Sequence, residues 1–341
     1  MSEALCQWLG IVLLIGVILD IIITTLSPQG AGFFSKFIIS GVWKIFLRAC
    51  GKKGDQPILD YYPTIVSVIM LTFWIALLWF SNALILISDQ NSVLTTNRIP
   101  TSYIEKIYYT GYTISTLGNG EFIPGSNFWM IYTNFLAFTG LLMITIGITY
   151  LVPLLQGEIQ RRTLCLHIAS FGDSVERILI QNWNGRDFSN LTDHFDDLRQ
   201  EIFYLGQNHK AYPILHHSHS HIKHRSTSIT ISMLDEALTI MMHCIPQNHW
   251  PNKTSIRSLR FAITSYLSTL NSAFITPAKE TPPSPDFEKL KHAGIPVTSD
   301  ENSLRDCYED FTDRRKLLLG LLHTDGWQWK DLNFNTLSID E

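Results

Sequence analysis

Three long apolar stretches constrain this chain more than any other feature of its sequence. Tyr62 to Ser88 contains no Asp, Glu, Lys or Arg, and Phe128 to Leu155 is equally free of them. Trp8 to Leu26 is interrupted by one charge, Asp20. A helix needs about 20 apolar residues to cross the hydrocarbon core of a bilayer. We therefore expect three membrane-spanning helices.

The charged residues divide the chain into two parts. Only 14 of its 56 Asp, Glu, Lys and Arg residues precede Gln156, so the sequence predicts a membrane half followed by a water-soluble half. After residue 155 there are 23 acidic and 19 basic residues, and the net charge is −4, which argues against a nucleic-acid partner. The five Cys residues lack CxxC spacing and are expected to be reduced thiols.

The distribution of positive charges predicts the orientation. Arg98 is the only cation in residues 89–100. The linker between the first two spans holds five cations: Lys36, Lys44, Arg48, Lys52 and Lys53. Positive charges favour the cytoplasmic side. We expect a multi-pass protein of the plasma (inner) membrane, with its N-terminus outside and its C-terminal half in the cytoplasm.

Two polar features of the N-terminal region have alternative interpretations. Gly32 to Cys50 carries polar residues four apart, which predicts an interfacial helix lying along the membrane lipid. A charged face on an ordinary tertiary helix is the alternative. Asp20 has two possible environments: it makes a polar contact inside the membrane, or its carboxylate lies within reach of the lipid headgroups. Its position near the end of the span favours the headgroups.

Residues 101–121, between the second and third spans, are too few and too polar to cross twice. Non-helical backbone at membrane depth is tolerated where protein buries it or where it lines a water-filled cavity, so we expect a re-entrant pore loop. It ends in six residues: Thr116, Leu117, Gly118, Asn119, Gly120 and Glu121. The two glycines allow backbone conformations that other residues avoid. Successive carbonyls can then face a common axis and replace the hydration shell of a cation.

The order of outer helix, pore helix, Thr-Leu-Gly-Asn-Gly-Glu and inner helix resembles the potassium-channel pore superfamily, in particular the two-helix pore module of bacterial ion channels. The resemblance covers about residues 62–155. It implies a cation channel with potassium as the default ion and sodium as the other permeant ion. It also implies that Thr116 forms the innermost ion site, that Leu117 replaces the usual Val or Ile, that Gly118 and Gly120 are the filter glycines, and that Glu121 is the carboxylate at the outer mouth. One loop per chain requires a homotetramer.

Asn119 departs from the pattern of the superfamily. An aromatic residue usually stands here and packs behind the filter. Tyr108, Tyr109 and Tyr112 on the pore helix are candidates for that support, and the Asn119 amide could hydrogen-bond the pore helix. The departure implies weaker potassium selectivity, although not a loss of cation conduction.

Small and polar residues along the third span leave several alternatives. Gly140 and Gly147 are candidate hinges, but close helix packing is the more frequent role of glycine in membrane helices. Pro153 either bends or ends the helix. Three threonines either line the pore or bond back to their own helix: Thr139, Thr145 and Thr149.

After Gln156 the apolar spacing predicts a mostly α-helical cytosolic domain. The expected helices are Glu158 to Trp183, Leu191 to Gly206, Ile229 to Cys244, Thr254 to Phe274 and Ser303 to His323, with a Pro-rich linker over 276–296. No dinucleotide-binding or P-loop motif is present, so the domain's ligand or protein partner is unknown. The adjacent acids Asp196/Asp197 and Asp235/Glu236 are expected to be solvated, because neighbouring residues on a helix do not face each other. We expect no enzyme activity and no cofactor.

A histidine cluster stands out: His216, His217, His219, His221 and His224, with His209 nearby. Dense imidazole tracts are candidates for binding zinc, nickel or copper, and His also titrates near neutral pH. The third interpretation is a polar surface loop. The spacing does not match a closed zinc site, which favours the surface loop.

The sequence thus predicts an all-α membrane protein with three regions: 1–61, the first span and the interfacial helix; 62–155, the pore module; and 156–341, the cytosolic domain. A different class of function is also open, a membrane-anchored sensor or scaffold with a vestigial pore. A membrane-tethered metal protein would rest on the histidines alone.

Overall fold

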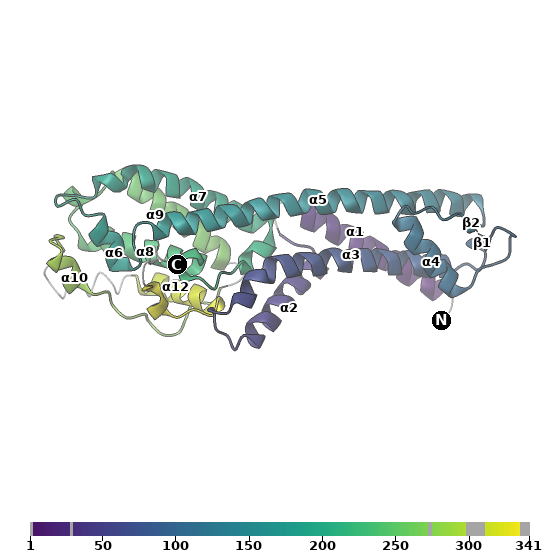
Figure 1. The fold of residues 1–341 in the computed structure, drawn as a ribbon, viewed down its shortest axis with the longest axis horizontal. Coiled ribbons are helices and arrows are strands. Elements are labelled where there is room, and N and C mark those ends of the chain that lie inside the picture. The colour runs from purple at the N-terminus through teal and green to yellow at the C-terminus, as the bar shows by residue number, and fades with distance from the viewer. Residues whose placement is uncertain (1–2, 28–29, 272–274, 298–310, 335–341) are drawn as a thin grey trace. The chain divides into compact units, whose positions relative to one another are not determined.

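The structure, a computed structural model, describes residues 3–27, 30–271, 275–297 and 311–334. Figure 1 shows that these residues are mostly helical, which confirms the predicted all-α class. The chain forms two units. Unit 1 contains Met1–Gly41 and Thr64–Leu155, and unit 2 contains Val42–Pro63 and Gln156–Glu341. Residues 42–63, although they precede the second span in the sequence, pack with the C-terminal half.

Unit 1 contains the membrane helices. Helices α1 (Glu3–Leu26), α3 (Tyr62–Ile87) and α5 (Asn127–Ala169) are the three described helices long and apolar enough to cross a membrane. A 3-10 turn, Pro57–Tyr61, leads into α3. The first part of α2 (Phe33–Ala49) and the short α4 (Tyr103–Ile114) complete the helices of this unit. The three predicted spans are therefore confirmed.

A two-stranded antiparallel sheet, which the sequence analysis missed, joins the ends of the pore loop. Strand β1 (Val93–Thr95) pairs with β2 (Phe122–Pro124), with Leu94 opposite Ile123. Figure 1 shows the pair at the end of unit 1 where α5 begins, close to α4. Strands of three residues carry too little alternation to be recognised in a sequence.

Helix α5 differs from the prediction at its C-terminal end. It continues through Pro153 to Ala169 as one helix, so Pro153 does not end the helix, and the prediction of a separate helix from Glu158 to Trp183 is wrong. Proline removes one backbone hydrogen bond from a helix, and here the flanking turns persist. The chain turns at Gly172, where a Cβ atom would lie 2.6 Å from the backbone nitrogen of Ile178. Helix α6 (Val175–Gln181) then follows.

Unit 2 is built around α8 (Thr227–Cys244), which is buried on nearly all sides. Helices α7 (Thr192–Ala211) and α9 (Lys253–Asn271) pack against each other. Two short helices follow, α10 (Phe287–His292) and α12 (Thr312–Thr324). Helix α10 lies within the Pro-rich linker predicted over 276–296, which therefore contains one short helix. The C-terminal end of the helix predicted over 254–274 and the start of the one over 303–323 lie outside the described residues.

Asp20 is 3% exposed within unit 1 and accepts hydrogen bonds from Phe34, Ser35 and Trp74. The interpretation that its carboxylate reaches the headgroups is therefore wrong. Phe34 and Ser35 lie on α2, 14 and 15 residues along the chain from Asp20, and Trp74 lies on α3, 54 residues along.

Candidate functional site

Helix α4, the predicted pore helix, has strong end signals. Ser102 and Glu105 form a capping box: the Ser102 backbone nitrogen donates to Glu105 Oε2 over 2.6 Å, and the Glu105 nitrogen donates to Ser102 Oγ over 3.4 Å. At the other end, the nitrogen of Leu117 donates to the Tyr112 carbonyl over 2.9 Å. The C-terminus of a helix carries partial negative charge, so the end of α4 favours cations near Thr116 and Leu117, where the predicted filter begins.

The backbone φ alternates in sign along residues 116–120, the predicted filter. Thr116, Gly118 and Gly120 have φ of 58°, 62° and 75°, whereas Leu117 and Asn119 have no positive φ. A φ that alternates in sign allows successive carbonyls to face the same side of the chain, which is the arrangement that a carbonyl-lined cation path requires. Thr116 is notable because a β-branched residue rarely adopts positive φ. Residues 116–121 are exposed in the single chain.

Three tyrosines of α4 make contacts with residues of the predicted filter, β2 and α5. Asn119 Nδ2 donates to Tyr108 Oη over 2.7 Å, so the hydrogen bond that the sequence suggested is present. The Tyr108 and Tyr112 rings meet edge to face with centroids 5.3 Å apart. Tyr112 Oη donates to the Phe122 carbonyl over 3.5 Å. The Tyr109 hydroxyl lies 2.7 Å from Thr133 Oγ1 on α5.

Buried polar contacts hold the outer end of the loop. Lys106 on α4 is 1% exposed, and its Nζ donates to the carbonyls of Asp89 and Gln90 over 2.6 and 3.2 Å. Trp129 Nε1 donates to Asp89 Oδ2 over 2.7 Å. These residues connect α4, the turn after α3 and the start of α5. The sequence analysis missed them because the carbonyl partners of Lys106 carry no signal in the sequence.

The inner-helix glycines differ from each other. A Cβ atom at Gly140 would lie 1.8 Å from the carbonyl oxygen of Ile114 at the end of α4, whereas one at Gly147 would meet Leu71 at an ordinary 3.6 Å. Gly140 is therefore a close-packing position. An apolar cavity of about 540 Å³ lies beside both glycines. The three threonines of this helix bond back to carbonyls four residues earlier, at Phe135, Leu141 and Thr145.

The histidine cluster is a packing element in unit 2. His217 and His219 are 6% and 2% exposed, so the surface-loop interpretation is wrong for them. The His217 ring stacks on Trp43 with centroids 5.1 Å apart, and His219 Nε2 lies 2.6 Å from the Gly54 carbonyl oxygen. Burial lowers the pKa of His217 to about 3 and that of His219 to about 4.

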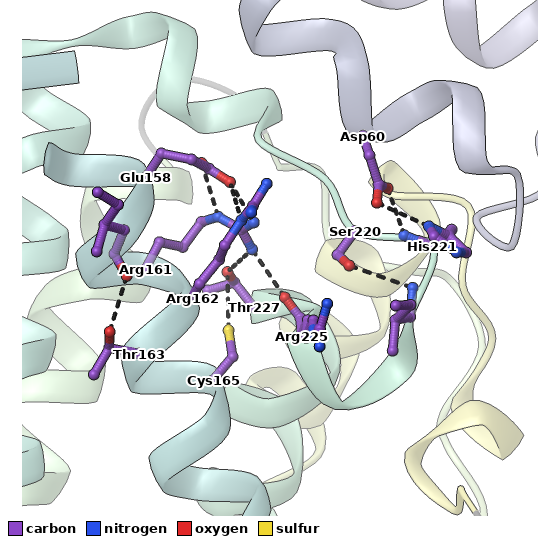
Figure 2. Close-up of polar contacts among 12 residues, drawn as sticks. Asp60, Glu158, Arg161, Arg162, Thr163, Cys165, Ser220, His221, Arg225 and Thr227 are labelled. Atoms are coloured by element: carbon purple, nitrogen blue, oxygen red, sulfur yellow. Dashed lines mark hydrogen bonds and ion pairs between the residues drawn. The ribbon is translucent and has the colours of Figure 1, made fainter. Parts of the chain in front are cut away.

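The remaining histidines have separate partners. His221 pairs with Asp60, with Nδ1 and Oδ2 2.8 Å apart (Figure 2). The His216 ring meets that of His209 at 5.1 Å, and His224 lies beside Phe334 at 6.3 Å. Among the described residues, no three His, Cys, Asp or Glu side chains are arranged to hold a metal ion. The cluster instead fastens residues 42–63 to the C-terminal half within unit 2.

The acids of α8 are buried rather than solvated, contrary to expectation. Asp235 pairs with Arg260 and with Arg314, whose Nη2 lies 2.6 Å from Asp235 Oδ1. Glu236 pairs with Arg315 at 2.9 Å. Figure 2 shows a further buried cation, Arg161, which donates to Glu158, the Arg225 carbonyl and Thr227. Arginine partners satisfy these carboxylates, which explains their burial.

Comparisons with known proteins identify one family model that matches part of this chain and one relative that matches most of it. A family model described as "Ion channel" matches residues 67–156, a range that includes most of α3, α4, the filter loop and the apolar part of α5. The "Uncharacterized membrane protein YdjJ" of Bacillus subtilis (strain 168) is 34% identical over 324 residues, which are 94% of this chain and 94% of that protein. No solved structure matches the chain. The predicted resemblance to the two-helix pore module is confirmed.

Proposed function

We propose that this chain, which belongs to the family of the Bacillus subtilis membrane protein YdjJ and carries an ion channel domain, conducts cations passively across the plasma membrane as a homotetramer. The observation that carries the proposal is the sign of φ over residues 116–120, which is positive at Thr116, Gly118 and Gly120 and not at the residues between them. It occurs between a capped pore helix and a paired strand, within the matched domain.

Four copies complete the pore. Each chain contributes one filter loop, Thr116 to Gly120 with Glu121 at the outer mouth, and a closed ring of carbonyls requires cyclic symmetry. The exposure of this loop in a single chain fits a surface that further copies and water complete. Potassium is the default ion. The tether from Asn119 to Tyr108 supports an ordered filter without an aromatic residue at position 119, and weak discrimination between potassium and sodium is expected.

The orientation follows from the cations of residues 32–53. They favour a cytoplasmic linker, an external N-terminus and a cytoplasmic C-terminal half. Conduction down a gradient needs no bond-making chemistry and no cofactor besides the permeant ions. Bending of α5 at Gly147, which has room around it, is a candidate opening motion.

Reconstitution tests the proposal. Purified protein in planar bilayers should carry cation currents, and the reversal potential under opposed potassium and sodium gradients gives the permeability ratio. Gly118→Ala should abolish the current, because a Cβ in the left-handed region costs about 1–2 kcal/mol per residue in each of four chains. Gly41→Ala is the matched control: both glycines have open space around them, but only Gly118 has positive φ.

The rival function, a sensor or scaffold with a vestigial pore, makes the opposite prediction. It expects no current from any preparation and a cell phenotype that survives Gly118→Ala. Loss of current in both variants would also count against the filter assignment, since Gly41 lies on α2 and outside the loop.

A further inference from the structure

Asp20 joins three helices of unit 1. Its Oδ1 accepts from the backbone nitrogens of Phe34 and Ser35 over 2.8 and 3.2 Å. Its Oδ2 accepts from Ser35 Oγ over 2.6 Å and from Trp74 Nε1 over 2.9 Å. The carboxylate on α1 therefore binds the first turn of α2 and the middle of α3.

This arrangement suits a charged carboxylate within an apolar segment. A buried charge is costly unless donors surround it, and the first N–H groups of a helix have no partner within that helix. The N-terminus of α2, a helix of 17 residues, also carries partial positive charge. A Cβ at Gly32 would lie 2.2 Å from Asp20 Oδ1, so the position before α2 admits only glycine without rearrangement.

Trp74 extends this contact to the inner helix. It is fully buried, and its ring packs edge to face with that of Tyr150 on α5, with centroids 6.2 Å apart. Tyr150 is itself 2% exposed. If the hydrogen bond between Asp20 and the Trp74 indole changes, the Trp74 ring can shift, and its contact with the Tyr150 ring passes that shift to α5.

We infer that Asp20 is a positioning residue for the pore: it fixes Trp74 and, through Trp74, the position of α5 at Tyr150. The N-terminal helix, which lies outside the matched channel domain, then sets the balance between conducting and non-conducting positions of the inner helix. This inference rests on the proposed channel function for its electrical readout.

A double-mutant cycle tests the inference. In Asp20→Asn the amide oxygen can still accept from Phe34 and Ser35, but its NH₂ group faces the indole N–H of Trp74, so two donors oppose each other. Trp74→Phe removes that donor. We expect D20N to change the open-to-closed ratio by roughly tenfold, the size of one charge-assisted hydrogen bond. Unitary conductance and reversal potential should stay unchanged. D20N combined with W74F should return toward the ratio of W74F alone.

The outcomes separate the inference from the proposed function. If wild-type protein carries no current, the channel proposal fails, and the same cycle is read from thermal unfolding in detergent. There D20N should lower Tm more in the wild-type background than in W74F.

If wild-type protein conducts but D20N channels gate like wild type, the inference is overturned. Additive effects of the two substitutions would overturn it as well, since they would show that Asp20 does not act through Trp74. Ser35→Ala, which removes one hydroxyl donor on α2, should leave the Trp74 coupling in place.

Discussion

The side-chain amide of Asn119 donates a hydrogen bond to the hydroxyl oxygen of Tyr108 over 2.7 Å. This bond ties the predicted filter to α4 at position 119, where the resemblance to potassium-channel pores implies an aromatic residue. The tyrosine ring stays in an edge-to-face contact with Tyr112, so the loop is held by a polar contact added to an aromatic cluster.

Tyr108→Phe removes the acceptor and keeps the ring. A net hydrogen bond contributes about 0.5–1.5 kcal/mol, so we expect the potassium-to-sodium permeability ratio to fall roughly two- to tenfold while cation conduction persists. Reversal potentials measure this ratio. Tyr103→Phe is the control, because Tyr103 lies on the same helix and is 70% exposed. An unchanged ratio in Y108F would show that this bond does not order the filter.

Gly140→Ala should destabilise unit 1, because its Cβ would overlap the carbonyl oxygen of Ile114. Overpacking of this kind typically costs about 1–3 kcal/mol. Gly147→Ala, on the same helix, meets only Leu71 at 3.6 Å and should be neutral or slightly stabilising, because alanine favours helix. Thermal unfolding in detergent compares the two variants. Equal losses in both would contradict the packing role of Gly140.

The buried imidazole of His217 predicts a loss of stability in acid. In the folded protein, burial and the nearby His209 and Lys44 lower the pKa of His217 to about 3. In an unfolded chain the pKa of a histidine is about 6.5. Below pH 6.5 the unfolded chain therefore binds a proton that the folded chain excludes. The free energy of unfolding falls by about 1.4 kcal/mol per pH unit for this group until the pH approaches 3.

His217→Phe isolates this effect, because the variant keeps a ring against Trp43 but cannot be protonated. The free energy of unfolding is measured for both proteins at pH 7, 6 and 5. From pH 7 to pH 5 it should fall less in the variant than in the wild type. Asp325, whose pKa burial raises to about 7, has the opposite pH dependence in both proteins and cancels from the comparison. Parallel curves would mean that His217 is accessible to protons in the folded state.

Asp235→Asn should destabilise unit 2 strongly. The substitution leaves the guanidinium groups of Arg260 and Arg314 without their shared carboxylate, and breaking a buried ion pair typically costs about 3–5 kcal/mol. Asp196→Asn provides the control, because that carboxylate is 45% exposed and lies 4.0 Å from Arg199. Exposed pairs contribute about 0–1 kcal/mol. Similar unfolding midpoints for the two variants would contradict the ion-pair assignment.

Local features of the sequence were enough to predict the three long apolar helices and the match to an ion channel family. A span is recognised by its length and by the absence of charge, as in Tyr62 to Ser88. The predicted filter rests on Gly118 and Gly120, whose positive φ in the structure is a conformation that glycine adopts readily as a single residue. Both signals lie within short stretches of chain.

The partners of polar residues were decided only by the tertiary structure. Asp20 and Trp74 are 54 positions apart, and Asp60 and His221 are 161 apart. Whether a carboxylate or an imidazole is solvated or buried depends on which donors and rings the fold brings to it. For that reason the sequence placed Asp20 at the headgroups and the histidines on the surface, whereas the fold buries Asp20, His217 and His219 and gives each of them a specific contact.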